Sequence, residues 1–297
     1  MYHNPVLLDE SIKGLNIDPE GIYVDATFGG GGHSKKILDS LEGGMLYAFD
    51  MDQDAIKNQI NHKNFKCIHA NYKHMKRFLK LEGVISVHGI LADLGISSYQ
   101  IDSASRGFSF RFNSHLDMRM NINSSLTGQY VINKYSEEDL SNVFYNYGEI
   151  RQSKRLARKI VASRKKNPII TTMDLKNVLN SISPYYKKKK FLSKVFQAIR
   201  IEVNDEINSL KDMLVDGVSL LKSRGRFVVL SYHSLEDRLV KNLFKRGNLE
   251  GNIESDIFGN SHNNLTDITR KVIVASEGEQ RDNPRSRSVK LRIAEKI

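Results

Sequence analysis

The stretch that decides the fold is Val24-Asp25-Ala26-Thr27-Phe28-Gly29-Gly30-Gly31-Gly32-His33-Ser34. An apolar run from Ile22 to Val24 leads into it, and a helix-like run from Lys35 to Leu41 follows. Glycines tolerate positive φ angles and let a ligand lie directly against the backbone. The helix that follows has unpaired N–H groups at its start. The order strand, glycine turn and helix predicts a ligand-binding turn at the beginning of an α/β sheet.

Two further carboxylates stand at the ends of apolar runs. Met45 to Phe49 ends at Asp50, about twenty residues after the glycines, where a carboxylate that binds a nucleotide ribose is expected. The chain then continues in the βαβ manner, with a helix expected over 54–60, a strand over 65–69, a helix over 72–81 and a strand over 87–92 that ends at Asp93. Because ligands bind at the carboxyl ends of parallel strands, Asp25, Asp50 and Asp93 are expected along one functional edge.

The glycine turn favours S-adenosylmethionine over a dinucleotide. In the pattern G-x-G-x-x-G/A, the last position falls on Ser34 or Lys35, depending on the starting glycine, so the third glycine is missing. Asp25 stands four residues before Gly29 and can face the positive sulfonium and ammonium groups of the methyl donor. NAD, and a glycine-rich turn that binds nothing, remain the alternatives at this point.

Composition narrows the class of partner. The 297 residues contain 45 Lys and Arg against 34 Asp and Glu, a net charge of +11, which favours a nucleic acid or an anionic membrane surface. A solvated basic surface is the alternative. Cys67 is the only cysteine, so an intrachain disulfide and a cysteine-rich metal site are excluded. No stretch reaches the roughly 18 apolar residues of a membrane span, and Met1 to Pro5 lacks the features of a secretory signal. We expect a cytosolic protein.

A helical insertion is expected between two halves of the sheet domain. The strand–helix alternation stops near Ser103, and helices are expected over 136–147, 149–165 and 172–182, before Pro184 and the charged run Lys187 to Lys190. We therefore predict a discontinuous domain of residues 1–102 and 195–297, with a helical domain of residues 103–194 for substrate recognition. One face of the second helix is basic and could bind RNA or remain solvated; its residues are Arg151, Lys154, Arg155, Arg158 and Lys165.

The second half of the sheet domain is expected to begin with a long helix. Apolar residues from Val203 to Leu221 recur every three or four positions. A strand over 226–231, a helix over 235–244, a loose polar loop over 248–267 and a short segment over 271–275 follow. The strict alternation of Val289 to Ile293 predicts a half-exposed strand.

Asp93 is the candidate catalytic residue, in the segment Asp-Leu-Gly-Ile-Ser-Ser-Tyr-Gln. The lone pair of an exocyclic amino nitrogen is delocalised into its ring, so the nitrogen is a weak nucleophile. A carboxylate that accepts an N–H hydrogen bond from the amine helps to localise the lone pair and can take the proton. A turn residue after the strand is the alternative reading of Asp93.

Loop aromatics could stack on a flipped base, since a base in a duplex cannot reach such a pocket. Core packing is the alternative for each candidate, and the candidates are Tyr99, Phe108, Phe110 and Tyr232. His233, which follows Tyr232, is a further candidate for substrate binding. It also lies near Ser231 and Asp237, but members of a hydrolase triad come from separate segments and no G-x-S-x-G motif is present. We therefore reject a Ser-His-Asp hydrolase.

Motifs along nearly the whole chain resemble the bacterial small-subunit ribosomal RNA cytosine-N4-methyltransferase family (RsmH, formerly MraW). Together with the glycine turn and 93–98, the matching blocks are His3 to Glu10, Arg106 to Arg111, Leu116 to Met120, Phe196 to Asn204, His233 to Arg238 and Asn283 to Ser288. They occur in the family's order.

The resemblance implies methylation of N4 of a decoding-centre cytidine in 16S ribosomal RNA, with S-adenosylmethionine as the donor. It also implies a class I methyltransferase sheet, which is Rossmann-like, with an inserted all-helical domain. The partner that it implies is 16S ribosomal RNA, either free or in the small ribosomal subunit, and it points to a homodimer. The family's donor contacts fall on Gly31, Gly32, His33, Asp50, Phe78, Asp93 and Gln100. His33 is expected to contribute mainly its backbone.

Three places in the chain depart from the family pattern. Tyr99 replaces a proline, Asn113 to His115 replaces Asp-Gly-Pro, and Ile150 replaces an acid. These changes affect loops and leave the three strand-end carboxylates in place. An RNA-binding assembly factor with a vestigial donor pocket is the main alternative function.

Overall fold

The computed structural model describes residues 5–183, 187–252 and 263–297. Pro184, the first residues of the amino-terminal motif and part of the expected polar loop lie outside the described residues. The chain divides into two compact units, Met1–Gly95 with Ile207–Ile297, and Ile96–Glu206. The second unit is longer at both ends than the expected range 103–194. At its carboxyl end the reason is helix α10, Lys188–Asn204, which continues unbroken through the predicted boundary.

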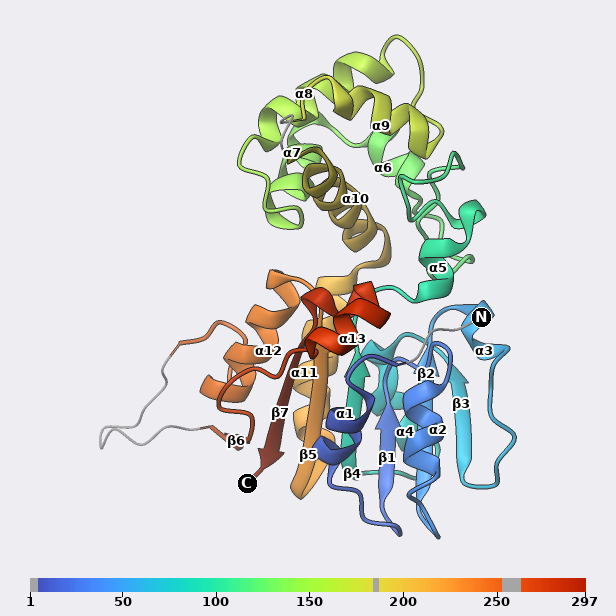
Figure 1. Ribbon diagram of the computed structural model, residues 1–297, viewed down its shortest axis with the longest axis vertical. Helices are drawn as coiled ribbons and strands as arrows, with labels where there is room; N and C mark the ends of the chain where they lie inside the picture. Colours follow the sequence, from blue (N-terminus) through green and yellow to red (C-terminus); the bar gives the residue numbers. More distant parts are fainter. Residues whose placement is uncertain (1–4, 184–186, 253–262) are drawn as a thin grey trace. The chain divides into compact units, whose positions relative to one another are not determined.

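The first unit contains one seven-stranded sheet with the strand order β3-β2-β1-β4-β5-β7-β6 (Figure 1). The first five strands in the sequence run parallel, and β7 runs antiparallel to both β5 and β6. The strands are β1 Ile22–Asp25, β2 Met45–Asp50, β3 Phe65–His69, β4 Val87–Asp93, β5 Leu221–Ser231, β6 Leu265–Asp267 and β7 Lys290–Lys296. Strands from both halves of the chain therefore share one sheet, as expected.

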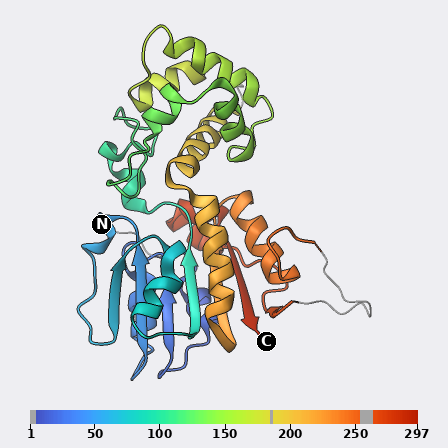
Figure 2. The same ribbon diagram turned by 180° about the vertical axis from the view of Figure 1, so that it is seen from behind.

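Helices cover both faces of this sheet and bury two apolar layers. On one face pack α1 (Leu8–Leu15) and α2 (Gly32–Leu38), which lie in front in Figure 1, with Leu15 and Ile37 in the core. On the other face pack α4 (Met75–Leu81), α11 (Glu206–Leu220) and α12 (Ser234–Arg246); α4 and α11 lie in front in Figure 2. The shorter elements of this unit are α3 Gln53–Ile56, η1 Tyr72–His74, α13 Glu277–Asp282 and η4 Pro284–Ser288.

Two helix boundaries differ from the sequence prediction. Helix α2 begins at Gly32 instead of Lys35, because Gly31 takes the left-handed conformation (φ 76°) that starts the helix. The long helix expected from Val203 is two helices, since Asp205 has a φ of 50° and ends α10 before α11 starts. Aspartate tolerates this conformation better than most residues, and the apolar spacing alone did not reveal the break.

The expectation that the last strand is half-exposed is wrong. Residues Leu291 to Ala294 of β7 are all buried, because β7 lies between β5 and β6 and is covered on both faces. Arg292 is paired in this setting, because it donates to Asp237 Oδ1 at 2.8 Å, while Lys290 donates to Oδ2 at 2.8 Å.

Breaking this pair should destabilise the fold. In Asp237→Asn, the buried Arg292 guanidinium loses its counter-charge, and we expect the free energy of unfolding at pH 7 to fall by about 3 kcal/mol. Burial raises the pKa of Asp237, but hydrogen bonds from Arg292 and Lys290 outweigh it and lower the pKa below its ordinary value. A lowered pKa stabilises the fold above the unfolded-state pKa, and this stabilisation is lost as pH falls through the folded-state pKa.

Urea denaturation at pH 7 and at pH 3 tests this prediction. The difference between wild type and Asp237→Asn should shrink at pH 3. The control is Asp54→Asn, which breaks the surface pair with Lys57 and should cost under about 1 kcal/mol. Equal stability of Asp237→Asn and wild type at pH 7 would contradict the prediction.

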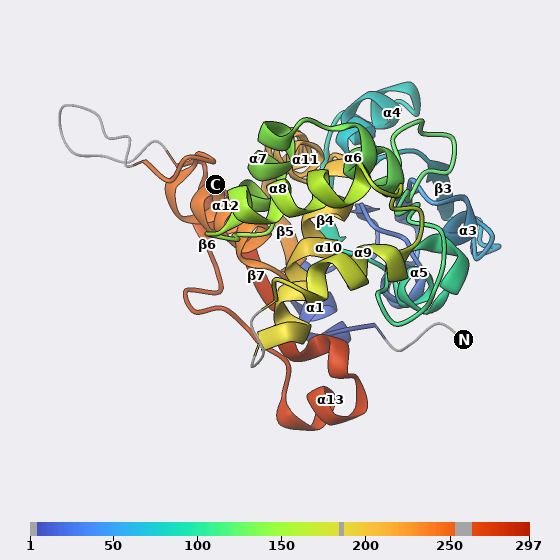
Figure 3. The same cartoon turned by 90° about the horizontal axis from the view of Figure 1, so that it is seen from above.

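The second unit is helical in the part of the chain that the structure describes. Helices α7 and α8 lie side by side, and α10 contacts α6, α7 and α9 (Figure 3). Asn204 of α10 fixes the loop that precedes α6. It accepts from the Met120 amide at 2.7 Å and donates to the Met118 carbonyl at 2.8 Å. The elements are α5 Ser98–Asp102, η2 Ala104–Arg106, α6 Gly128–Lys134, α7 Glu137–Asn146, α8 Ser153–Arg164, α9 Thr172–Asn180 and α10.

Local signals account for most of these boundaries. Ser136 and Thr171 accept hydrogen bonds from the third residue of α7 and α9, as helix caps do. Helix α8 begins at Ser153 instead of residue 149, because Glu149 has a φ of 48° and cannot continue a helix. Over the described ranges, every helix is either too short or too polar to cross a membrane.

Candidate active site

The three predicted carboxylates end three neighbouring parallel strands. Asp25 is the last residue of β1, Asp50 of β2 and Asp93 of β4. Strand β1 lies between the other two, because its Asp25 pairs with Ala48 of β2 and with Leu91 of β4. The sequence prediction that these acids share one sheet edge is therefore confirmed.

Asp25 accepts hydrogen bonds from residues at both ends of the glycine turn. Its side chain is fully buried; Oδ2 accepts from Ser34 Oγ at 2.6 Å, and Oδ1 accepts from the Thr27 amide at 3.0 Å. Burial raises the pKa of this carboxyl. Both oxygens are thus used to join the end of β1 to the start of α2.

Asp50 reaches across to the same turn. Its Oδ2 accepts from the Gly29 amide at 2.8 Å and its Oδ1 from the Asp52 amide at 2.8 Å. Burial raises its pKa to about 6. A carboxylate has about four acceptor positions, so Asp50 can still accept hydrogen bonds from the hydroxyls of a ribose. Asp52, which caps α3 through the Asp54 amide at 3.0 Å, was not singled out from the sequence.

The glycines of the turn have different reasons to lack a side chain. A Cβ on Gly32 would lie 2.2 Å from Pro5 Cγ, and one on Gly31 would lie 3.0 Å from the Phe28 ring. A Cβ on Gly29 would come within 4 Å only of the Thr27 carbonyl oxygen, at 3.9 Å, so the protein leaves the backbone uncovered there. This uncovered backbone beside Asp50 fits a bound nucleoside.

Two hydrogen bonds hold Asp93, and the His33 ring lies nearby. Its amide donates to Thr27 Oγ1 at 2.7 Å, and its Oδ1 accepts from the Tyr232 hydroxyl at 2.7 Å. Its Oδ2 lies 3.9 Å from His33 Nδ1. The side chain is 24% exposed. Burial raises the pKa of Asp93 to about 7, with the nearby Glu236 acting in the same direction and the Tyr232 hydrogen bond opposing it.

The His33 ring lies beside Asp93, whereas the expected backbone contact of His33 with the donor stays a prediction. The ring is buried, and its Nε2 lies 3.2 Å from the Val6 carbonyl oxygen. A carbonyl only accepts hydrogen bonds, so Nε2 carries the proton, and the lone pair of Nδ1 faces Asp93. Burial lowers the pKa of His33 and so favours this neutral form.

The remaining predicted donor contacts lie on separate elements. Phe78 of α4 is partly buried, with its ring 6.4 Å from that of Phe49, edge-on. Gln100 belongs to the helical unit, where it is buried and its Oε1 accepts from the Ser97 amide at 3.1 Å.

The predicted base-stacking residues differ in exposure. Tyr99 is 43% exposed, whereas Phe108 is buried at 7% with the Arg106 guanidinium 5.9 Å from its ring centre. Phe110 packs edge-on against Phe196, with 5.4 Å between the ring centres. Tyr99 is thus the most accessible of these three aromatics.

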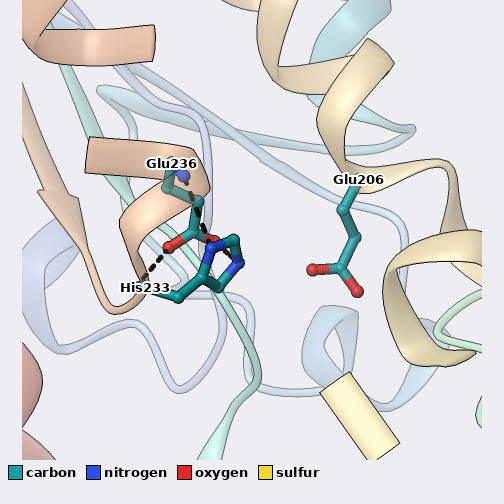
Figure 4. Close-up of side chains that lie close together, drawn as sticks. All are labelled: Glu206, His233 and Glu236. Atoms are coloured by element: carbon teal, nitrogen blue, oxygen red, sulfur yellow. Dashed lines mark hydrogen bonds and ion pairs between the residues drawn. The ribbon is translucent and has the colours of Figure 1, made fainter. Parts of the chain in front are cut away.

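Tyr232 and His233 follow β5 and are organised by Glu236 of α12. Glu236 Oε2 accepts from the Tyr232 amide at 2.8 Å and from the His233 amide at 3.3 Å. His233 Nδ1 accepts from the Glu236 amide at 3.4 Å, and its Nε2 lies 3.1 Å from Glu236 Oε1. Figure 4 shows the two side chains turned toward each other. His233 therefore caps α12, a role that the sequence-based candidate list did not include.

The predicted basic face lies on the solvent side of its segment. Arg151, Arg155 and Arg158 are exposed, and the opposite side of α8 buries Leu156, with Ala157 and Ile160 beside it. Arg151 precedes the first residue of α8, and Arg158 lies 3.4 Å from Glu137 in an exposed ion pair. These three arginines are referred to below as the basic stripe.

The sheet and the site together define a class of enzyme. A parallel sheet with an antiparallel β7 beside β5, a glycine turn after β1 and carboxylates after β2 and β4 are the features of a class I S-adenosylmethionine-dependent methyltransferase.

The chain belongs to the MraW methylase family, whose family model matches residues 1–297. Relatives named "Ribosomal RNA small subunit methyltransferase H" match at full length. The protein from Phocaeicola vulgatus is 52% identical and the alignment covers 100% of this chain and 98% of that protein. The protein from Cytophaga hutchinsonii is 50% identical over 100% of both chains, and that from Amoebophilus asiaticus is 50% identical over 99% of this chain and 96% of its own.

Proposed function

We propose that this protein transfers a methyl group from S-adenosylmethionine to the exocyclic N4 of a decoding-centre cytidine in 16S ribosomal RNA. The names of its full-length relatives support a ribosomal RNA substrate. The structural observation that carries the proposal is Asp93, a partly exposed carboxylate at the end of β4 with one oxygen held by Tyr232.

The chemistry of Asp93 suits an aromatic amine. Oδ1 already accepts from the Tyr232 hydroxyl, so we expect Oδ2 to be the oxygen that accepts an N–H hydrogen bond from the acceptor base. Its pKa of about 7 lets it hold a proton or release one near neutral pH, which is the range in which a general base works best. The bound donor supplies an electrophilic methyl group on a sulfonium, and the site's main contribution is alignment of the amine with it.

The donor site fits the residues around the glycine turn. Asp50 offers acceptors for ribose hydroxyls beside the uncovered backbone of Gly29. Phe78 offers a ring for the adenine, and Asp25 a nearby negative charge. Gln100 remains a proposed contact.

Methylation of small ribosomal subunits tests the proposal directly. Subunits that lack the modification are incubated with radiolabelled donor, and the labelled nucleoside is identified after digestion. We expect label on N4 of a cytidine. An assembly factor with a vestigial pocket would bind RNA without turnover and show no donor affinity in calorimetry, whereas an NAD enzyme would bind NADH in a fluorescence titration and not the donor. Either result would contradict the proposal.

The helical unit is proposed to contact the RNA backbone through the basic stripe. Exposed arginines that bind phosphates release counterions, so binding weakens with salt. Replacing Arg151, Arg155 and Arg158 together with Gln should weaken RNA binding at least about tenfold and reduce the slope of log K against log salt by about 2.

A matched control variant tests whether the position of the removed positive charges matters, and not only their number. Residues Lys188, Lys189 and Lys190 are also exposed and lie in the same unit, so their triple replacement with Gln removes the same charge. Filter binding between 50 and 200 mM salt compares the two variants. Equally weakened RNA binding in the two variants would indicate a general charge effect. An unchanged salt slope in the arginine variant would show that the basic stripe does not contact the RNA backbone. The homodimer implied by the family resemblance stays a prediction, which light scattering of the purified protein tests.

A further inference from the structure

Tyr232 is fixed at its backbone, its ring and its hydroxyl. Its amide donates to Glu236 Oε2 at 2.8 Å, and its hydroxyl donates to Asp93 Oδ1 at 2.7 Å. The ring lies over Gly95, where a Cβ would meet the Tyr232 Cδ2 at 3.5 Å. Burial, together with the Asp93 charge, raises the pKa of the hydroxyl well above its ordinary value, so it stays protonated and remains a donor.

These contacts decide which oxygen of Asp93 is available. The amide of Asp93 is held by Thr27 Oγ1 at 2.7 Å, so backbone and side chain are both fixed. With Oδ1 bonded to Tyr232, Oδ2 is the oxygen left to face an incoming amine, on the side where His33 Nδ1 lies at 3.9 Å. A freely rotating carboxylate would sample other orientations and lose alignment.

We propose that Tyr232 is a positioning residue for Asp93, and that its hydroxyl, not its ring face, is what the reaction requires. This inference rests on the proposed methyl transfer, in which Asp93 receives the N–H of the acceptor. It differs from a role in base stacking, which a phenyl ring would serve equally well. Removing the hydroxyl oxygen of Tyr232 therefore distinguishes the positioning role from the stacking role.

The hydrogen bond also affects the pH at which Asp93 ionises. The titratable groups that face Asp93 are His33 from α2, Tyr232 after β5, Glu236 from α12 and Asp25 at the end of β1. Of these, Tyr232 donates a hydrogen bond to the carboxylate and so favours its charged form. Removing the hydroxyl should shift ionisation of Asp93 to higher pH by about one unit.

The test compares Tyr232→Phe with Tyr232→Leu. If the hydroxyl positions Asp93, Tyr232→Phe should lower kcat about tenfold at pH 7, and the rise of its pH–rate profile should move about one unit to alkaline pH. The dissociation constant for the donor should change less than twofold. Tyr145→Phe removes a hydroxyl from a tyrosine that is 61% exposed on α7 and should leave both quantities unchanged.

A second readout does not depend on turnover. In protein with 13C-labelled aspartate carboxyls, the signal absent from Asp93→Asn identifies Asp93, and its titration midpoint should rise in Tyr232→Phe. Full activity of Tyr232→Phe with loss in Tyr232→Leu would overturn the inference in favour of stacking. Loss of donor binding in Tyr232→Phe, or an unshifted Asp93 titration, would also overturn it. An inactive wild type would instead refute the proposed function.

Discussion

Asp93→Asn should lower kcat for methyl transfer by about 10²- to 10⁴-fold, the usual contribution of a positioned general base. The amide that replaces the carboxylate cannot take the amine proton, although its oxygen can still accept from Tyr232. In wild type, activity should rise with pH through about 7 as Asp93 ionises. Single-turnover rates with saturating donor measure both effects. Equal rates for wild type and Asp93→Asn would show that the reaction does not require the Asp93 carboxylate.

The same substitution should stabilise the folded protein at alkaline pH. The pKa of Asp93 is raised in the folded state, so between pH 4 and 7 that state binds more protons than the unfolded chain, and this group makes stability fall as pH rises. Asparagine carries no such cost, so Tm of the variant should exceed that of wild type by about 2–5 °C at pH 8. The difference should vanish below about pH 4. Asp212→Asn replaces an exposed carboxylate of α11 and should change neither Tm nor activity.

Asp25→Ala should have the second largest effect, through the shape of the glycine turn. The substitution leaves the buried Ser34 hydroxyl and the Thr27 amide without the acceptor they share. We expect a loss of about 2–4 kcal/mol in the free energy of unfolding. We also expect donor affinity to fall at least about tenfold, because the turn that carries Gly29 is no longer tied to α2.

Asp25→Asn shows whether charge or hydrogen bonding matters. The amide keeps an acceptor for the Thr27 amide and can still pair with Ser34, so stability should stay near that of wild type while the negative charge near the donor is lost. Calorimetry with the donor and thermal denaturation measure the two properties separately. Asp39→Ala, at an exposed position just after α2, is the matched control. Unchanged stability of Asp25→Ala would show that the turn does not need this acid.

Much of the fold could be predicted because local patterns report it. The strands β1, β2 and β4 appeared within one residue of the apolar runs that predicted them, and β3 matches the range expected from the strand–helix alternation. Buried parallel strands show continuous apolar runs. Helix α6 and the break at Asp205 could not be predicted in this way. A left-handed residue inside a helical apolar pattern leaves the spacing of neighbouring apolar residues almost unchanged.

The same division holds for the site. Strand-end carboxylates are visible in a sequence, because topology places every carboxyl end of a parallel strand at one edge. Ser34 and Thr27 stood inside the quoted stretch, but nothing in their spacing shows that they bond Asp25 and the Asp93 amide. The signal for His233 as a helix cap was available, since Glu236 three residues later is the second member of a capping box.

The sequence by itself determined that a glycine turn and three acids share one edge of an α/β sheet, because both follow from the order of local patterns along the chain. Only the tertiary structure decided what each acid can do. Tyr232 lies 139 residues from Asp93 and reaches it through the pairing of β4 with β5. Burial then raises the pKa of Asp93 to about 7. Burial depends on tertiary packing and therefore cannot be deduced from the spacing of residues along the sequence.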